Sequence, residues 1–130
     1  MSETVGTVVL VDDEGELRAM LRTVLVRRDL AVHDFADAES TLAAIDGGVV
    51  TEIDLFVIDA GLPGVSGIAL ARAIEQRLPG AGGRTVIITG HDPGPDLLDL
   101  SEELNVRVMW KPFRIDAFLE VCDRVVRERP

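Results

Sequence analysis

Apolar positions along the chain follow two spacings in turn. Residues 7–11 form a short run rich in β-branched side chains that stops at two aspartates, which predicts a strand. Apolar residues then recur at helical spacing, at Leu17, Met20, Leu21, Val24 and Leu25. The chain therefore opens with a strand, a short acidic turn and a helix, and Asp13 with Glu16 has the form of an N-cap and capping box.

The same alternation continues to the end of the sequence. Further strands are predicted over residues 31–35, 55–58, 85–88 and 106–110. Helical spacing of apolar residues predicts helices within 38–45, 70–78, 97–104 and 115–126, and residues 92–95 read as a turn. Five strands thus alternate with five helices.

Strands that are apolar on both faces and alternate with helices are typical of a parallel sheet covered on both sides. We therefore expect an α/β fold, a flavodoxin-like doubly wound sheet of five parallel strands in the order 2-1-3-4-5 with five helices. The sequence contains no solenoid repeat and no low-complexity tract. A single domain over residues 1–130, with residues 1–6 as a short tail, accounts for the whole chain.

Composition narrows the function classes. The chain has 13 Lys and Arg against 23 Asp and Glu, a net charge of −10, which disfavours binding to a phosphate backbone. A single cysteine excludes an internal disulfide framework, and no apolar stretch approaches the roughly 20 residues of a membrane helix. We expect a cytoplasmic protein that binds neither nucleic acid nor membrane.

Three carboxylates end neighbouring strands of the expected sheet. Asp12 and Asp13 follow the first strand and Asp59 follows the third, and these strand ends are adjacent in the predicted order. Three like charges at such range repel one another unless a cation neutralises them. Oxygen ligands without a thiolate or a convergent histidine favour Mg²⁺, so the sequence predicts a magnesium site.

Two further residues at strand ends extend this site toward phosphate chemistry. Lys111 after the fifth strand supplies a positive charge, and the Thr89 hydroxyl after the fourth can bond to a phosphoryl oxygen. Phosphoryl transfer needs little more than a metal, such donors and a positioned nucleophile. Asp59 is the best candidate nucleophile because Asp12 and Asp13 lie together on one turn as a metal-holding pair.

Each of these residues also has an ordinary explanation. The aspartate pair is compatible with helix capping, Asp59 with a turn, Thr89 with a β-branched strand end and Lys111 with a solvated side chain. Their common position at the carboxyl ends of strands favours one shared site over separate structural roles.

Taken together, the strand-end motifs resemble those of response-regulator receiver domains of two-component signalling, including the chemotaxis receiver. The resemblance covers nearly the whole chain. It rests on Val11-Asp12-Asp13-Glu14, Asp59-Ala60-Gly61-Leu62-Pro63-Gly64-Val65-Ser66-Gly67, Ile88-Thr89-Gly90 and Lys111-Pro112-Phe113, in this order and at family-like spacing.

The resemblance implies a phosphorelay function and a role for each residue. Asp59 would accept a phosphoryl group from a phosphohistidine of a sensor histidine kinase or a histidine phosphotransfer protein. Asp13, with Asp12 partly through water, would hold Mg²⁺, and the third ligand would be the Gly61 backbone carbonyl. Thr89 and Lys111 would bind phosphoryl oxygens, and the peptide bond between Lys111 and Pro112 would be cis.

The chain departs from the family pattern where receivers carry a switch aromatic, because Val108 occupies that position. Trp110 lies on the same side of the strand, and two interpretations stay open. It packs under the fourth or fifth helix, or it anchors a homodimer or effector on the helix 4, strand 5 and helix 5 face. Gly61 offers no side chain to guide a water, so dephosphorylation is expected to be slow unless His91 assists.

Three other functions compete with the receiver interpretation. A flavodoxin-type cofactor-binding protein needs a Ser, Thr or Gly-rich loop after the first strand, but Asp12, Asp13 and Glu14 stand there. A haloacid-dehalogenase-like phosphatase needs an Asp-x-Asp motif, which the adjacent Asp12 and Asp13 do not form. A phosphorylation-independent interaction module on a receiver fold is the more serious rival, and Val108 is its main support.

Overall fold

The computed structural model describes residues 4–90 and 94–128. Its strands are β1 (Gly6–Val11), β2 (Leu30–Phe35), β3 (Leu55–Asp59), β4 (Thr85–Thr89) and β5 (Arg107–Trp110). Its helices are α1 (Gly15–Val26), α2 (Ala38–Asp46), α3 (Gly67–Arg77), α4 (Gly94–Leu104) and α5 (Ile115–Glu128), with a short 3₁₀ helix, η1 (Ala81–Arg84), before β4. Strands and helices alternate as the sequence predicts.

All strand pairs are parallel, and the sheet order is β2-β1-β3-β4-β5. The predicted fold class and strand order are therefore confirmed. The registers pair Val11 with Ile58, Asp59 with Ile88, and Thr89 with Trp110. Because the strands run in one direction, the carboxyl ends of β1, β3, β4 and β5 meet at one edge of the sheet.

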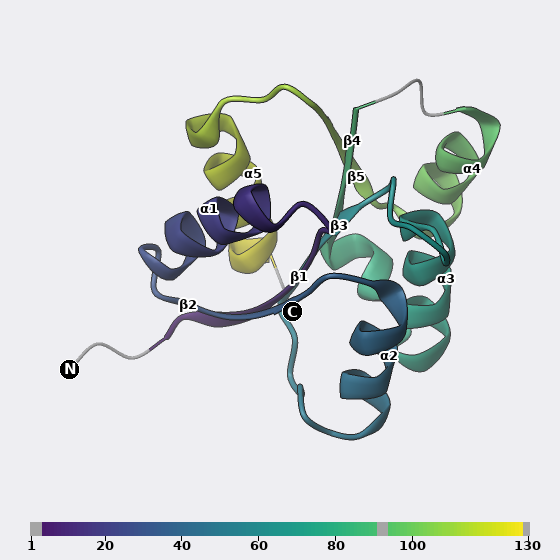
Figure 1. The fold of residues 1–130 in the computed structure, drawn as a ribbon, viewed down its shortest axis with the longest axis horizontal. Helices are drawn as coiled ribbons and strands as arrows, with labels where there is room; N and C mark the ends of the chain where they lie inside the picture. Colours follow the sequence, from purple (N-terminus) through teal and green to yellow (C-terminus); the bar gives the residue numbers. More distant parts are fainter. Residues whose placement is uncertain (1–3, 91–93, 129–130) are drawn as a thin grey trace.

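Helices cover both faces of the sheet, as Figure 1 shows, with α1 and α5 on one side and α2, α3 and α4 on the other. The alternation of side chains along β1 produces both cores: Val8 and Leu10 pack with α1 and α5, whereas Val9 and Val11 pack with the other three helices. Full burial of an aliphatic side chain contributes roughly 1.5–3 kcal/mol, so these two layers hold the strand ends rigidly.

The last helix, α5, buries one apolar stripe and exposes its other face. Phe118 and Cys122 on that stripe are fully buried. Burial raises the pKa of the Cys122 thiol to about 12, so this cysteine is a core residue and not a nucleophile. Among the residues described, no helix has both the length and the apolar character needed to cross a membrane.

The predicted cap of the first helix is wrong. The N-cap of α1 is Glu14, which makes no side-chain capping bond, so Asp13 and Glu16 do not form a capping box. Instead, Asp12 Oδ1 accepts a hydrogen bond of 2.8 Å from the Glu14 N–H. The Asp12 side chain, and not that of Asp13, thus closes the turn. The Asp13 carboxylate is therefore available to the acid cluster at the sheet edge.

Two other boundaries differ from the sequence expectation. Gly94 and Pro95, expected in a turn, already belong to α4, and proline is tolerated there because the first helical turn needs no N–H partner. Asp92 and Pro93 lie outside the described residues. At the other end of the chain, β1 begins at Gly6, the last residue of the expected tail.

Candidate functional site

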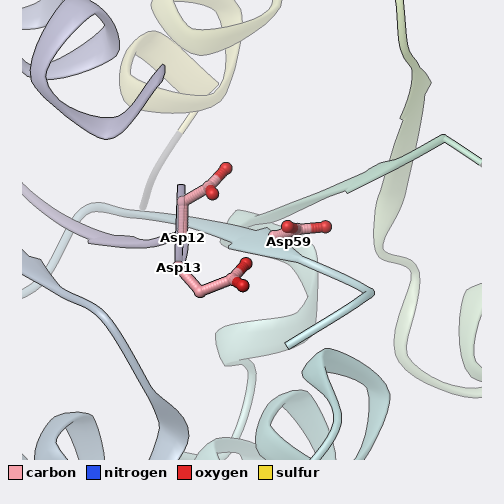
Figure 2. A group of neighbouring side chains, drawn as sticks. All are labelled: Asp12, Asp13 and Asp59. Carbon is pink, nitrogen blue, oxygen red and sulfur yellow. The ribbon is translucent and has the colours of Figure 1, made fainter. Parts of the chain in front are cut away.

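The three predicted carboxylates come together at the carboxyl edge of the sheet. Asp12 and Asp13 follow β1, and Asp59 is the last residue of β3. Figure 2 shows the three side chains close together at the ends of these two segments, and one oxygen from each lies within 4.8 Å of the others. The juxtaposition that the sequence predicts is confirmed.

The three acids differ in their exposure. Asp12 is 1% exposed and Asp59 is 7% exposed, whereas Asp13 is open to solvent. A hollow of about 330 Å³ opens beside them, lined by Asp13, Glu14, Asp59, Gly61, Thr89, Gly90 and Lys111. Asp59 is therefore a buried carboxylate that still faces a space large enough for a phosphoryl group and several waters.

Burial is the main reason why the pKa of Asp12 lies above its ordinary value, and the nearby charge of Asp59 raises it further. The hydrogen bond from the Glu14 N–H and the charge of Lys111 oppose this shift. Ionising Asp12 in the absence of a cation thus costs more free energy than ionising a solvated aspartate, and a bound divalent cation would lower this cost.

Lys111 is the cation of the site. Its Nζ lies 3.6 Å from Asp59 Oδ2 and 3.6 Å from Glu14 Oε1. Its backbone N–H donates to the Thr89 carbonyl at 2.8 Å, and its peptide bond to Pro112 is cis, as the resemblance implied. The contact with Glu14 was missed by sequence reasoning, because the two residues are far apart in the sequence and no motif links them.

The loop after β3 is held close to the acid that precedes it. The Gly61 N–H donates to Asp59 Oδ1 at 3.0 Å, and the Ala60 N–H donates to the Ile88 carbonyl at 2.8 Å. A Cβ on Gly67 would lie only 2.1 Å from the Asp59 carbonyl oxygen, so α3 can start this close to β3 only with glycine. The sequence signal for Gly67 was its place in the receiver motif.

The edge formed by β4 and β5 carries the remaining candidates. Thr89 is 4% exposed, lines the hollow and pairs in register with Trp110. Val108 packs against the core shared with α2, α3 and α4. Trp110 is 48% exposed, so the interpretation that a helix covers it is wrong and its indole lies at the surface of an edge strand.

The donor set fits Mg²⁺. Each ligand atom that the three acids offer is a carboxylate oxygen, and the adjoining hollow has room for the waters that Mg²⁺ retains. Gly61 lines the same hollow, in keeping with its expected place near the metal. His91, the candidate for assisting dephosphorylation, lies outside the described residues.

An apolar groove of about 560 Å³ adjoins the acidic hollow. It is lined by Leu17, Met20, Gly90, Lys111, Pro112, Phe113 and Ile115. Gly90 and Lys111 line both spaces, so the groove runs from the face of α1 directly to the entrance of the site. Sequence reasoning did not find it, because the apolar residues of α1 and α5 served there only to predict the two helices.

Comparison with known proteins places this site in a family context. The chain is 32% identical over 131 residues to the transcriptional regulatory protein TcrA of Mycobacterium tuberculosis, covering 95% of this chain and 47% of that protein. It is 26% identical over 126 residues to the C4-dicarboxylate transport transcriptional regulatory protein DctD of Rhizobium meliloti, covering 95% of this chain and 26% of the relative. The chain therefore spans less than half the length of these relatives.

Solved structures of receiver domains also match the chain, and it covers nearly their whole length. The receiver domain of NtrX from Brucella abortus matches with a TM-score of 0.81 at 26% identity, covering 94% of this chain and 99% of that one. A CheY-like receiver domain protein from Methanospirillum hungatei shares the fold, with a TM-score of 0.82 at 22% identity, covering 98% of this chain and 96% of that one. The family model described as the response regulator receiver domain matches residues 8–123. With these matches and the acid cluster at the sheet edge, the chain belongs to the response regulator receiver domain family of two-component signalling.

Proposed function

We propose that Asp59 is the phosphoacceptor of this receiver, taking a phosphoryl group from a phosphohistidine on a sensor histidine kinase or a histidine phosphotransfer protein. The observation that carries the proposal is the state of Asp59. It is a buried carboxylate that faces the hollow, lies 3.6 Å from Lys111 and stands beside two further acids. Asp12, in contrast, is buried without lining the hollow.

In the proposed reaction a carboxylate oxygen of Asp59 forms a bond to phosphorus while the bond from phosphorus to the imidazole nitrogen breaks. The electron pair of that bond stays on the imidazole, which leaves as neutral histidine once it holds one proton. The product is an acyl phosphate on Asp59, and water later cleaves it to inorganic phosphate and the free carboxylate. Positioning of the reacting groups supplies most of the rate enhancement in such transfers.

Asp12, Asp13, Asp59 and the backbone carbonyl of Gly61 would hold Mg²⁺, which supplies positive charge to the phosphoryl oxygens when bound. The Lys111 ammonium, already directed at Asp59, would bind a phosphoryl oxygen. The Thr89 hydroxyl would bind another. Gly61 leaves the hollow without a side chain to orient a water, so we propose slow dephosphorylation unless His91 assists.

The proposed unit is the whole chain, residues 1–130, acting as one receiver that assists its own phosphorylation and dephosphorylation. The cytoplasm is its proposed location, which the single buried thiol suits. We also propose that the chain binds neither nucleic acid nor membrane. The net charge of −10 supports the absence of nucleic-acid binding.

The experiment that tests the function is incubation with acetyl phosphate, followed by intact mass measurement. The wild type is expected to gain one phosphoryl group in the presence of Mg²⁺ and none when a chelator removes the metal. The rival function, an interaction module that works without phosphorylation, is favoured by Val108 in place of the switch aromatic. No mass gain at any Mg²⁺ concentration would contradict the proposed phosphoacceptor and favour the rival.

We further propose that the apolar groove beside the site receives the phosphohistidine donor. The donor must reach the hollow from solvent, and the groove shares Gly90 and Lys111 with it. Met20 lines the groove and is 42% exposed, so it offers apolar area to a docking protein.

A charge at Met20 is therefore expected to slow transfer from a protein donor without affecting transfer from a small one. Met20→Asp should lower the rate from a phosphorylated histidine phosphotransfer protein by about tenfold or more, because a buried unpaired charge weakens the interface. The rate from acetyl phosphate should be unchanged. Val26→Asp is the matched control, since Val26 lies at the far end of α1 and is 48% exposed. Equal slowing by both variants would contradict the docking proposal.

The output surface is proposed to lie on the helix 4, strand 5 and helix 5 face. Leu98 of α4 is 58% exposed and Trp110 of β5 is 48% exposed, and tryptophan is a typical anchor of interfaces. Exposed Asp99 and Glu102 lie on the same helix as Leu98. In a symmetric homodimer each copy brings the same patch, which would place these acids near one another. We therefore propose an effector with apolar and basic side chains as the partner.

Phosphorylated wild type is accordingly expected to stay monomeric in sedimentation equilibrium at micromolar concentration. A phosphorylation-dependent dimer that Trp110→Ala abolishes would show that a second copy, and not a basic effector, occupies this face.

A further inference from the structure

Arg18, in the second turn of α1, links the first two strands beneath the acidic site. Its Nη1 donates to the backbone carbonyl of Asp12 at 2.6 Å, and its Nε donates to Asp34 Oδ2 on β2 at 3.1 Å. The Arg18 side chain is 23% exposed and the Asp34 side chain 29% exposed, so both contacts are partly buried. Arg18 lines neither the acidic hollow nor the apolar groove.

The carbonyl that Arg18 holds belongs to the peptide bond between Asp12 and Asp13. The N–H of Asp12 is held as well, by a 3.1 Å bond to the Phe35 carbonyl. Because a peptide unit is planar, fixing this carbonyl fixes the direction in which the chain enters Asp13. The contact therefore constrains the backbone that carries two of the three clustered carboxylates.

This constraint opposes the electrostatic repulsion among the three carboxylates. Three carboxylates with oxygens within 4.8 Å of one another repel in the absence of a cation, and Asp13 is the exposed member that is free to turn outward. A charge-assisted hydrogen bond to the turn keeps the acids converged before the metal arrives. Binding then requires less rearrangement of the chain, which is the basis of preorganisation.

We propose that Arg18 is a positioning residue for the Mg²⁺ site, acting through the backbone between Asp12 and Asp13 and held in place by Asp34. The inference rests on the proposed function, since it concerns the same acids. It assigns to Arg18 a role in metal affinity, and none in contact with the metal, the phosphoryl group or the phosphohistidine donor.

Arg22 is the natural control because it shares one partner with Arg18 and lacks the other. Arg22 donates to Asp34 Oδ1 at 2.5 Å and to the Val32 carbonyl at 2.9 Å. It lies one helical turn after Arg18 on the same helix. Substitution of either arginine should therefore weaken the contact between α1 and β2. Only substitution of Arg18 should release the turn between Asp12 and Asp13.

The test is calorimetric titration of the full chain with Mg²⁺. Arg18→Met is expected to raise the Kd by about tenfold or more, the range found when residues that orient metal ligands are removed, whereas Arg22→Met should stay within about twofold of the wild type. Phosphorylation by acetyl phosphate provides a second readout. Arg18→Met should need about tenfold more Mg²⁺ for its half-maximal rate and yet approach the wild-type rate at saturation.

Arg18→Lys should recover part of the affinity, because one ammonium can reach the Asp12 carbonyl without the forked geometry that also engages Asp34. If Arg18→Met does not fold, the comparison of Arg18→Lys with Arg22→Lys carries the same test. An unchanged Kd in the Arg18 variants, or an equal loss in those of Arg22, would overturn this inference alone. A wild type that takes up no Mg²⁺ would overturn the proposed function together with it.

Discussion

The Asp59→Asn variant is expected to gain no phosphoryl group from acetyl phosphate at Mg²⁺ concentrations where the wild type gains one. The amide keeps the size of the side chain and can still accept the 3.0 Å hydrogen bond from Gly61. It lacks the anionic oxygen that lies 3.6 Å from Lys111 and would attack phosphorus. The effect is thus complete loss of the reaction, measured by intact mass, with little change in the fold.

Two variants make this result specific. Asp116→Asn changes an exposed acid at the start of α5, paired only with its neighbour Arg114 among the ion pairs of the described residues, and should be phosphorylated like the wild type. Asp13→Asn should be phosphorylated slowly and recover in part at high Mg²⁺, as a metal ligand would. Continued phosphorylation of Asp59→Asn would show that the acceptor is another residue.

Mg²⁺ is expected to stabilise the folded protein strongly at neutral pH. A ligand that binds only the folded state adds about 2.7 kcal/mol at roughly 100 times its Kd, which corresponds to about 10 °C in the unfolding midpoint of a domain of this size. Thermal unfolding with increasing Mg²⁺ measures the shift, and Asp13→Asn should show a much smaller one. An unfolding midpoint that does not respond to Mg²⁺ would contradict the proposed metal site.

Without Mg²⁺, the Asp12 carboxylate should make the folded protein less stable as the pH rises. Burial and the charge of Asp59 raise the pKa of Asp12 in the folded state, so above the ordinary value of 3.8 the folded state holds more protons here than the unfolded state. By linkage, this group makes stability fall as the pH rises from 3.8 through the raised pKa, and stability does not recover at higher pH. Added Mg²⁺ should cancel the penalty at pH 7 and lose its effect in acid, where protons compete for the carboxylates.

Asp12→Asn isolates this contribution. The amide oxygen can still accept the Glu14 N–H, but the buried charge is gone. Without Mg²⁺ the variant should be more stable than the wild type at pH 7, and the difference should shrink as the pH falls toward 4. With Mg²⁺ the order should reverse, because the variant binds the metal weakly. A metal-free Asp12→Asn less stable than the wild type at pH 7 would contradict the electrostatic penalty assigned to the Asp12 carboxylate.

Much of the fold and the outline of the site were predictable from local patterns. The uninterrupted apolar runs that became β3 and β4 indicated strands buried on both faces, and both strands are fully buried. Because parallel strands bring their carboxyl ends to one edge, the positions of Asp12, Asp13 and Asp59 after their strands were sufficient to predict their meeting.

The details that local patterns missed depend on contacts between distant segments or on small backbone choices. The capping box at Asp13 was expected from spacing alone, but the Asp12 side chain closes the turn first. The ion pair of Glu14 with Lys111 joins the turn after β1 to the end of β5. Local sequence patterns do not predict such a contact, since the spacing of residues around Glu14 or Lys111 does not indicate which distant residue each will meet.

The order of amino acids was thus enough to establish the alternation of strands and helices, the edge of the sheet where the acids gather and the family to which the chain belongs, because these follow from side-chain periodicity, chain direction and motif. Three-dimensional packing was needed to establish that Asp59 is buried and still lines the hollow, that Trp110 is exposed, and that Arg18 holds the turn between Asp12 and Asp13. Those outcomes depend on several elements at once, because in a closely packed protein the position of each side chain depends on all of its neighbours.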